Sequence, residues 1–122
     1  MKKKVLVIDD NKNNLLLEKD LLELDGFEVY EAENASTGII IAMKLKPDVI
    51  IMDIRLPDFR GSDAARILRK DKETSAIPII FVTASVMAEG REEIKNIVNS
   101  AFIRKPINTR TFASEVRAFI PE

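Results

Sequence analysis

Charged residues directly follow short apolar runs at three places in this sequence. These places are run 5–8 followed by Asp9 and Asp10, run 49–52 followed by Asp53, and run 101–103 leading to Lys105. In an open parallel sheet, residues that follow the strands meet in one crevice beyond the carboxyl ends of the strands. We therefore expect three carboxylates and one ammonium group to share a single cleft.

A cleft of this composition needs further positive charge. Two like charges about 4 Å apart repel by roughly 4 kcal/mol at an effective dielectric near 20. Lys105 offsets one of the three negative charges, and a divalent cation would offset the other two. The sequence contains neither His nor Cys, so the ligands are oxygens. The expected ion is Mg²⁺, held by Asp10 and Asp53.

A metal ion beside a lysine neutralises phosphoryl oxygens, so the expected reaction class is phosphoryl transfer. Thr83 ends another apolar run and brings a hydroxyl to the same rim, and the backbone N–H of Ala84 is a second donor. Attack by Asp53 on phosphorus would give an aspartyl phosphate. Each residue alone also fits a structural role, such as a cap or a solvated loop. Their joint placement after four strands favours function.

Composition excludes several other classes of protein. The 122 residues are 46% apolar, which predicts one domain over 1–122. Lys plus Arg number 19 against 20 Asp plus Glu, so binding to nucleic acid is not expected. The longest purely apolar run, 39–43, is too short for a membrane span or a signal peptide. We therefore predict a cytoplasmic protein with no membrane association.

The apolar pattern alternates five times between strand-like runs and helical stretches. The predicted strands are 5–8, 28–32, 48–52, 79–83 and 101–104. The predicted helices run from Asn11 to Gly26, from Asn34 to before Pro47, from Gly61 onward, over 88–99, and from Asn108 to before Pro121. Only run 28–32 alternates between apolar and polar residues, so it is predicted to lie at an edge and the other four to be covered on both faces.

This order predicts an α/β fold. Short connections and right-handed crossovers favour a doubly wound, flavodoxin-like sheet of five parallel strands in the order 2-1-3-4-5. In the first helix, Leu17, Leu21 and Leu24 are expected to form the buried stripe. In the third helix, Ala65 and Leu68 are expected to face inward.

The chain resembles the receiver domain of response regulators from Val5 to about Ile120. Four motifs carry the resemblance: V-L-V-I-D-D-N at 5–11, D-V-I-I-M-D-I-R-L-P at 48–57 with Gly61 beyond it, V-T-A at 82–84, and R-K-P at 104–106. The resemblance implies a phosphoacceptor of a two-component system or phosphorelay. Its phosphoryl donor would be a phosphohistidine on a sensor histidine kinase or a histidine phosphotransferase. It would assist its own phosphorylation and dephosphorylation and act on no separate substrate.

The resemblance also implies a role for each residue of the cleft. Asp53 matches the phosphoacceptor, Asp9 and Asp10 match the acidic pair that holds Mg²⁺, and Lys105 matches the lysine that contacts the phosphoryl group. The main-chain carbonyl of Arg55 matches a further metal ligand. The peptide bond between Lys105 and Pro106 matches one that is typically cis in the family.

Two further residues match the family's conformational switch, namely Thr83, which supplies the hydroxyl, and Phe102, which supplies the aromatic ring. The implied output surface for a downstream protein comprises helix 88–99, strand 101–104 and the helix from Asn108. Three features depart from the common pattern. Arg55 is long and cationic, Asn99 replaces a frequent glycine and would take its left-handed conformation, and the switch aromatic has no hydroxyl.

Two other functions compete with this interpretation. One is a Mg²⁺-dependent phosphatase that acts through an aspartyl phosphate, but enzymes of the haloacid-dehalogenase type place a second Asp where this chain has Arg55. The other is a scaffold that binds proteins without phosphorylation, against which the complete set of acidic residues argues. The end of the sequence soon after the fifth helix suggests a stand-alone receiver that acts by binding partners.

Overall fold

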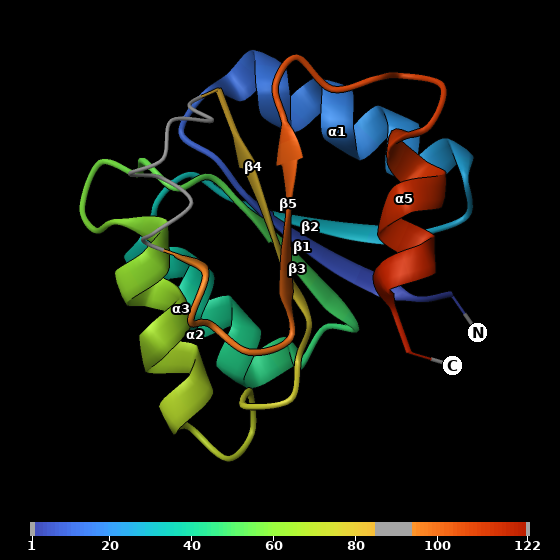
Figure 1. The fold of residues 1–122 in the computed structure, drawn as a ribbon. Helices are drawn as coiled ribbons and strands as arrows, with labels where there is room; N and C mark the ends of the chain where they lie inside the picture. Colours follow the sequence, from blue (N-terminus) through green and yellow to red (C-terminus); the bar gives the residue numbers. More distant parts are fainter. Residues whose placement is uncertain (1, 85–93, 122) are drawn as a thin grey trace.

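The computed structural model describes residues 2–84 and 94–121 and contains one five-stranded sheet (Figure 1). In chain order, the elements are β1 (Lys4–Ile8), α1 (Lys12–Leu24), β2 (Glu28–Ala32), α2 (Ala35–Leu45), β3 (Val49–Met52), α3 (Gly61–Lys70), β4 (Ile79–Thr83), β5 (Ser100–Arg104) and α5 (Phe112–Phe119). All strand pairs are parallel, and the strand order is β2-β1-β3-β4-β5. The predicted fold class and strand order are therefore confirmed, with β2 at an edge.

Helices cover both faces of the sheet, which explains why the central strands β1, β3 and β4 are apolar apart from Lys4 at the start of β1 and Thr83 at the end of β4. In β1, Val5 and Val7 pack with buried residues of α1 and α5, whereas Leu6 and Ile8 pack with residues of α2 and α3. Figure 1 shows α1 and α5 on one side of the sheet and α2 and α3 on the other. Because successive side chains of a strand point to opposite faces, each central strand contributes to both cores.

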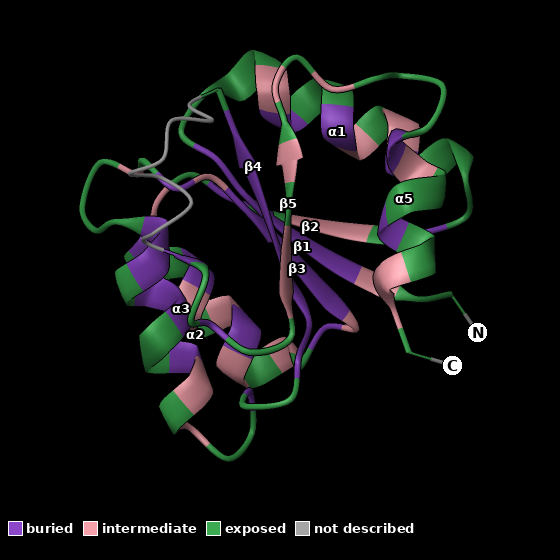
Figure 2. Cartoon of the chain, viewed as in Figure 1, coloured by how far each residue is buried: buried purple, intermediate pink, exposed green. Residues whose placement is uncertain are grey.

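Strand β5 differs from the prediction that it would be covered on both faces. It forms the second edge of the sheet, and none of its five residues is buried (Figure 2). Phe102 is 40% exposed, whereas Phe81, its neighbour in β4, is fully buried. An edge strand has a neighbour on one side only, so its side chains have fewer groups to pack against.

In α1, the predicted buried stripe is wrong for Leu17 and Leu24, whereas Leu21 is half-buried and packs against the core. The helix begins where expected, because the Asn11 side chain accepts a hydrogen bond from the backbone N–H of Asn14. However, Leu17 and Leu24 are 41% and 86% exposed. The buried residues are Leu15, Glu18 and Leu22. Leucines occupy two overlapping stripes of this helix, and the one that packs on the sheet is the one that includes an acid.

The other helices follow the predictions more closely. Asn34 caps α2 by accepting from the backbone N–H of Thr37, and Ala65 and Leu68 of α3 are fully buried. Helix α5 begins four residues later than predicted. The Asn108 side chain instead accepts from the backbone N–H of Arg110, which closes a turn before the helix.

Half of the predicted helix 88–99, residues 88–93, lies outside the described residues, and residues 95–99 form turns and a bend instead of helix. In its described part, Asn99 adopts a left-handed conformation with φ of 55°, as predicted. The predicted cis bond between Lys105 and Pro106 is also present. No helix within the described ranges is long and apolar enough to cross a membrane.

Candidate functional site

Three carboxylates meet at the carboxyl ends of β1 and β3. The backbone N–H of Asp9 donates to the carbonyl of Ala32, and that of Asp53 donates to the carbonyl of Ile8, so hydrogen bonding between strands continues past the strand ends. Each of Asp9, Asp10 and Asp53 offers a ligand atom, and these atoms lie within 4.8 Å of one another. We call these three residues the acidic cluster. Asp9 is buried, Asp53 is half-buried and Asp10 is exposed.

Lys105 bridges two members of the acidic cluster. Its Nζ donates to Asp9 Oδ2 at 3.0 Å and to Asp53 Oδ2 at 2.9 Å. The lysine is held from β4, because its backbone N–H donates to the carbonyl of Thr83 at 2.9 Å. Burial alone would lower the pKa of Lys105, but the hydrogen bonds and charges of Asp53 and Asp9 outweigh burial and raise it. The ammonium group therefore stays charged.

The acidic cluster fits a magnesium ion. Its donor atoms are all carboxylate oxygens, and Mg²⁺ prefers one or two carboxylates together with water. With Lys105 included, the formal charge of the group is about −2, which a divalent cation would cancel. Exposed Asp10 keeps the cluster open to solvent on one side.

The loop between β3 and α3 holds Asp53 in place. Asp53 Oδ1 accepts from the backbone N–H of Arg55 at 3.2 Å. A Cβ atom at Gly61 would overlap the carbonyl oxygen of Asp53, so only glycine lets α3 begin this close to Asp53. Arg55 itself is exposed beside the cleft.

A second carboxylate in this loop, Asp58, was not predicted from the sequence. Its two oxygens accept hydrogen bonds from the Ser36 hydroxyl at 2.6 Å and from the backbone N–H groups of Ala35 and Ser36 at 2.9 Å. These bonds, led by the Ser36 hydroxyl, lower the pKa of Asp58 to about 2. Asp58 thus ties the loop after Asp53 to the N-terminal end of α2.

Of the remaining predicted residues, Thr83 and Ala84 lie at the end of the sheet that carries the acidic cluster. Thr83 is the last residue of β4 and is 4% exposed, and Ala84 follows it at the surface. Phe102 lies in β5, two positions before Arg104, the residue paired with Thr83. The structure therefore brings Lys105 into contact with Asp9 and Asp53, and it places Thr83 at the rim. Phe102 lies farther back along the edge strand.

Sequence reasoning missed Glu18, a buried carboxyl near the acidic cluster. Glu18 is 2% exposed and lies on the buried face of α1. Burial, followed by the charge of Asp9, raises the pKa of Glu18 to about 8, although the charge of Lys105 acts in the opposite direction. The signal was present in the sequence, since Glu18 lies three residues after Leu15 and four before Leu22. An acid on an apolar stripe marks a position of interest.

Glu18 and Lys105 line the same pocket, which we call the rear pocket. Its volume is about 290 Å³, and it lies between α1 and the segment that follows β5. The residues that line it are Asn14, Leu17, Glu18, Ala84, Lys105, Pro106 and Ile107. Glu18 and Lys105 thus both border one hollow with partly apolar walls.

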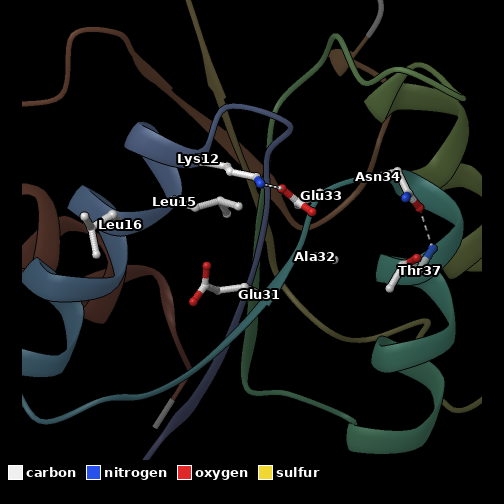
Figure 3. A pocket seen from close by; sticks show the side chains of 8 residues that line it. All are labelled: Lys12, Leu15, Leu16, Glu31, Ala32, Glu33, Asn34 and Thr37. Atoms are coloured by element: carbon white, nitrogen blue, oxygen red, sulfur yellow. Dashed lines mark hydrogen bonds and ion pairs between the residues drawn. The ribbon is translucent and has the colours of Figure 1, made fainter.

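Another pocket, of about 610 Å³, lies between α1, β2 and α2 (Figure 3). Several polar groups in it already pair with nearby residues. Lys12 Nζ lies 4.0 Å from Glu33 Oε1, Asn34 caps α2, and Glu31 forms an ion pair with Lys19. These groups do not converge on a common point, so the chemistry of the protein is better placed at the acidic cluster.

Comparison with known proteins identifies the family of the chain. Residues 5–117 match the family model of the response regulator receiver domain. The chain belongs to the response-regulator receiver family. The polar-differentiation response regulator DivK of Brucella anthropi is 34% identical over 120 residues, a match that covers 98% of both chains. The protein is thus a receiver domain of two-component signalling.

Solved structures of receivers have the same fold. The chemotaxis response regulator CheY4 of Vibrio cholerae superposes with a TM-score of 0.91 at 25% identity, over 98% of this chain and 100% of that one. A CheY-like receiver domain protein from Methanospirillum hungatei gives a TM-score of 0.89 at 27% identity, over 97% of this chain and 93% of that one. The similarity extends over nearly the full length of each receiver.

Proposed function

We propose that this receiver accepts a phosphoryl group on Asp53 from a phosphohistidine of a sensor histidine kinase or a histidine phosphotransferase. The observation that carries the proposal is the double contact of Lys105 with Asp9 and Asp53 beside exposed Asp10. This arrangement puts one reachable carboxylate next to a fixed positive charge. It also leaves a net negative charge that a metal ion would balance.

The proposed reaction transfers a phosphoryl group from a histidine nitrogen of the donor to the carboxylate of Asp53. One carboxylate oxygen of Asp53 forms a bond to phosphorus while the bond between phosphorus and the histidine nitrogen of the donor breaks. The nitrogen keeps the electron pair of that bond and takes up a proton. Lys105, the Thr83 hydroxyl and the backbone N–H of Ala84 are proposed to donate hydrogen bonds to the phosphoryl oxygens.

Asp9, Asp10, Asp53 and the main-chain carbonyl of Arg55 are proposed to hold Mg²⁺. When bound, the ion would supply positive charge to the phosphoryl oxygens as negative charge builds up on them. The side chain of Arg55 is exposed, and Arg55 lies two residues after Asp53. We therefore propose that Arg55 also affects how readily water reaches the phosphorylated site.

The proposed output is a change of surface. A phosphoryl group that binds better to one arrangement of Thr83 and Phe102 would shift the domain toward that arrangement. The affected surface would include range 88–99, β5 and α5, and would bind a downstream protein. Exposed Phe102 on an edge strand leaves the aromatic ring room to change position.

The test is to incubate the protein with Mg²⁺ and acetyl phosphate or phosphoramidate and to measure phosphate incorporation by intact mass spectrometry. We expect one phosphate on the wild-type protein, which peptide mapping should locate at Asp53. We expect none on Asp53→Asn. Asp20→Asn, a change at an exposed carboxylate of α1, is the matched control and should leave incorporation unchanged. Phosphate found at another residue, or none in folded wild-type protein with either donor, would contradict the proposal.

A further inference from the structure

Glu18 is a buried carboxyl with no partner among the described residues. It is 2% exposed, and the described part of the chain gives it neither a hydrogen bond nor an ion pair. A buried polar group that is left unsatisfied costs about 1–3 kcal/mol. A hydrogen-bond donor brought to Glu18 would recover part of this cost.

A suitable donor, Lys105, lines the same pocket as Glu18. Lys105 is the cationic residue in the lining of the rear pocket, and its ammonium group has three N–H donors on a flexible stem. Two of these donors already bind Asp9 and Asp53. Figure 1 shows the segment after β5, which carries Lys105, running beside α1, which carries Glu18. The lysine therefore has carboxyls available to it on two sides.

The balance between these two sides depends on what occupies the acidic cluster. A divalent ion in the acidic cluster would repel the ammonium group of Lys105, which now contacts Asp9 and Asp53. The same ion would engage the Asp53 carboxylate that now holds Lys105. Both effects weaken the present position of the ammonium group.

We propose that Glu18 is a positioning residue for Lys105, giving its ammonium group a second binding position when a divalent cation occupies the acidic cluster. The inference rests on the metal site in the proposed function. Either protonation state of Glu18 has an oxygen that accepts an ammonium hydrogen bond. The rear pocket gives the side chain space to move. Glu18 would thus hold the lysine within reach until the phosphoryl group arrives.

The first test follows the two side chains by NMR while Mg²⁺ is added without a phosphoryl donor. The Lys105 ammonium nitrogen and the Glu18 carboxyl carbon should shift together, with the same dependence on Mg²⁺ as the Asp10 and Asp53 signals. Glu18→Leu should change the Lys105 response, whereas Glu18→Gln, which keeps an acceptor oxygen, should restore much of it. Circular dichroism verifies that both variants are folded.

The second test separates an effect through Lys105 from a direct effect of charge. Glu18→Leu should weaken Mg²⁺ binding several-fold, measured by calorimetry, but should have no effect when Lys105 is already Met. The control Glu23→Gln removes an exposed carboxylate from the same helix and should leave affinity unchanged. An equal loss in the Lys105→Met background would mean that Glu18 acts on the ion directly, and would overturn the positioning role.

The remaining outcomes distinguish this inference from the proposed function. Shifts at Asp10 and Asp53 without any response of Lys105 and Glu18 would overturn the positioning role and leave the metal site intact. No Mg²⁺ response at any of the three aspartates, in folded protein, would overturn the metal site and the positioning role together.

Discussion

The acidic cluster and the rear pocket each contain a buried carboxyl, but the two carboxyls differ in their hydrogen bonding. Asp9 and Glu18 are both 2% exposed. Asp9 accepts hydrogen bonds from the backbone N–H of Asn11 and from Lys105, whereas Glu18 has no such partner in the described part of the chain. A buried carboxyl tolerates its charge only when paired and otherwise favours its neutral form. The position of Lys105 therefore decides where negative charge can reside in this cleft.

The largest expected effect is the loss of phosphorylation on the cluster side. Asp53→Asn replaces the nucleophilic oxygen by an amide and should reduce phosphate incorporation by more than about 100-fold, to background. Stability should fall much less, because the remaining amide oxygen can still accept from Lys105 or Arg55. Mass spectrometry and thermal denaturation measure the two effects. A variant that still gains phosphate would move the acceptor elsewhere.

Removing Lys105, which contacts the acidic cluster and also lines the rear pocket, should alter both sites. Lys105→Met leaves Asp9 without its cationic partner, and breaking a buried pair from one side costs about 3–5 kcal/mol. The free energy of unfolding, measured with urea in metal-free buffer, should fall by an amount near the lower end of this range. The reason is that Asp9 keeps its hydrogen bond from the backbone N–H of Asn11. Added Mg²⁺ should restore more stability to this variant than to wild type, because no ammonium competes with the ion. Equal restoration in both proteins would argue against competition.

Burial of Glu18 at the rear pocket should make the free energy of unfolding depend on pH. The pKa of Glu18 is raised to about 8, from 4.5 in the unfolded chain, so the folded state binds this proton more tightly. Its contribution to stability is fully present below pH 4.5 and is lost as the pH rises to about 8. The total loss is on the order of 3–5 kcal/mol. Glu18→Gln should remove this slope, and urea titrations from pH 5 to 9 measure it. An identical slope in the variant would assign it to other groups.

Loss of the close contact between Gly61 and the loop that carries Asp53 should have a moderate effect. Gly61→Ala forces a methyl group against the Asp53 carbonyl, and overpacking of this kind costs about 1–3 kcal/mol. Phosphate incorporation should slow because Asp53 shifts with its loop. Serine at position 62, also buried, is the matched comparison, since Ser62→Ala removes atoms without adding any. If both variants phosphorylate at the wild-type rate, the close approach of α3 has no role in the reaction.

The cluster was predictable from the sequence and the rear pocket was not, for a physical reason. Asp9, Asp10, Asp53 and Lys105 follow strands, and strand ends in a parallel sheet converge whatever their separation in sequence. Glu18 lies in a helix, where the inward face depends on packing. With leucines at neighbouring positions, periodicity alone favoured the stripe through Leu17, which proved exposed.

Three other differences have similar causes. The exposure of β5 followed from its place at the sheet edge, and an apolar run such as 101–103 does not distinguish an edge strand from a covered one. Asp58 acts through Ser36, which is 22 residues away in the sequence. A contact of that range between a loop and the first turn of a helix leaves no local pattern. The late start of α5 reflects a competing turn, because an asparagine side chain caps a turn and a helix equally well.

The smallest expected effect on stability is at Asp10. It tests whether this exposed member of the acidic cluster contributes less to stability than buried Asp9 does. Asp10 is exposed, so Asp10→Asn removes a like charge near Asp9 and Asp53 and should change the free energy of unfolding in metal-free buffer by less than about 1 kcal/mol. Mg²⁺ affinity should nevertheless fall about tenfold or more, because a charged oxygen ligand is replaced by a neutral one. Calorimetry measures the affinity, and Asp20→Asn is the control. A large loss of stability with unchanged affinity would instead place Asp10 with Asp9, as a structural partner inside the cleft.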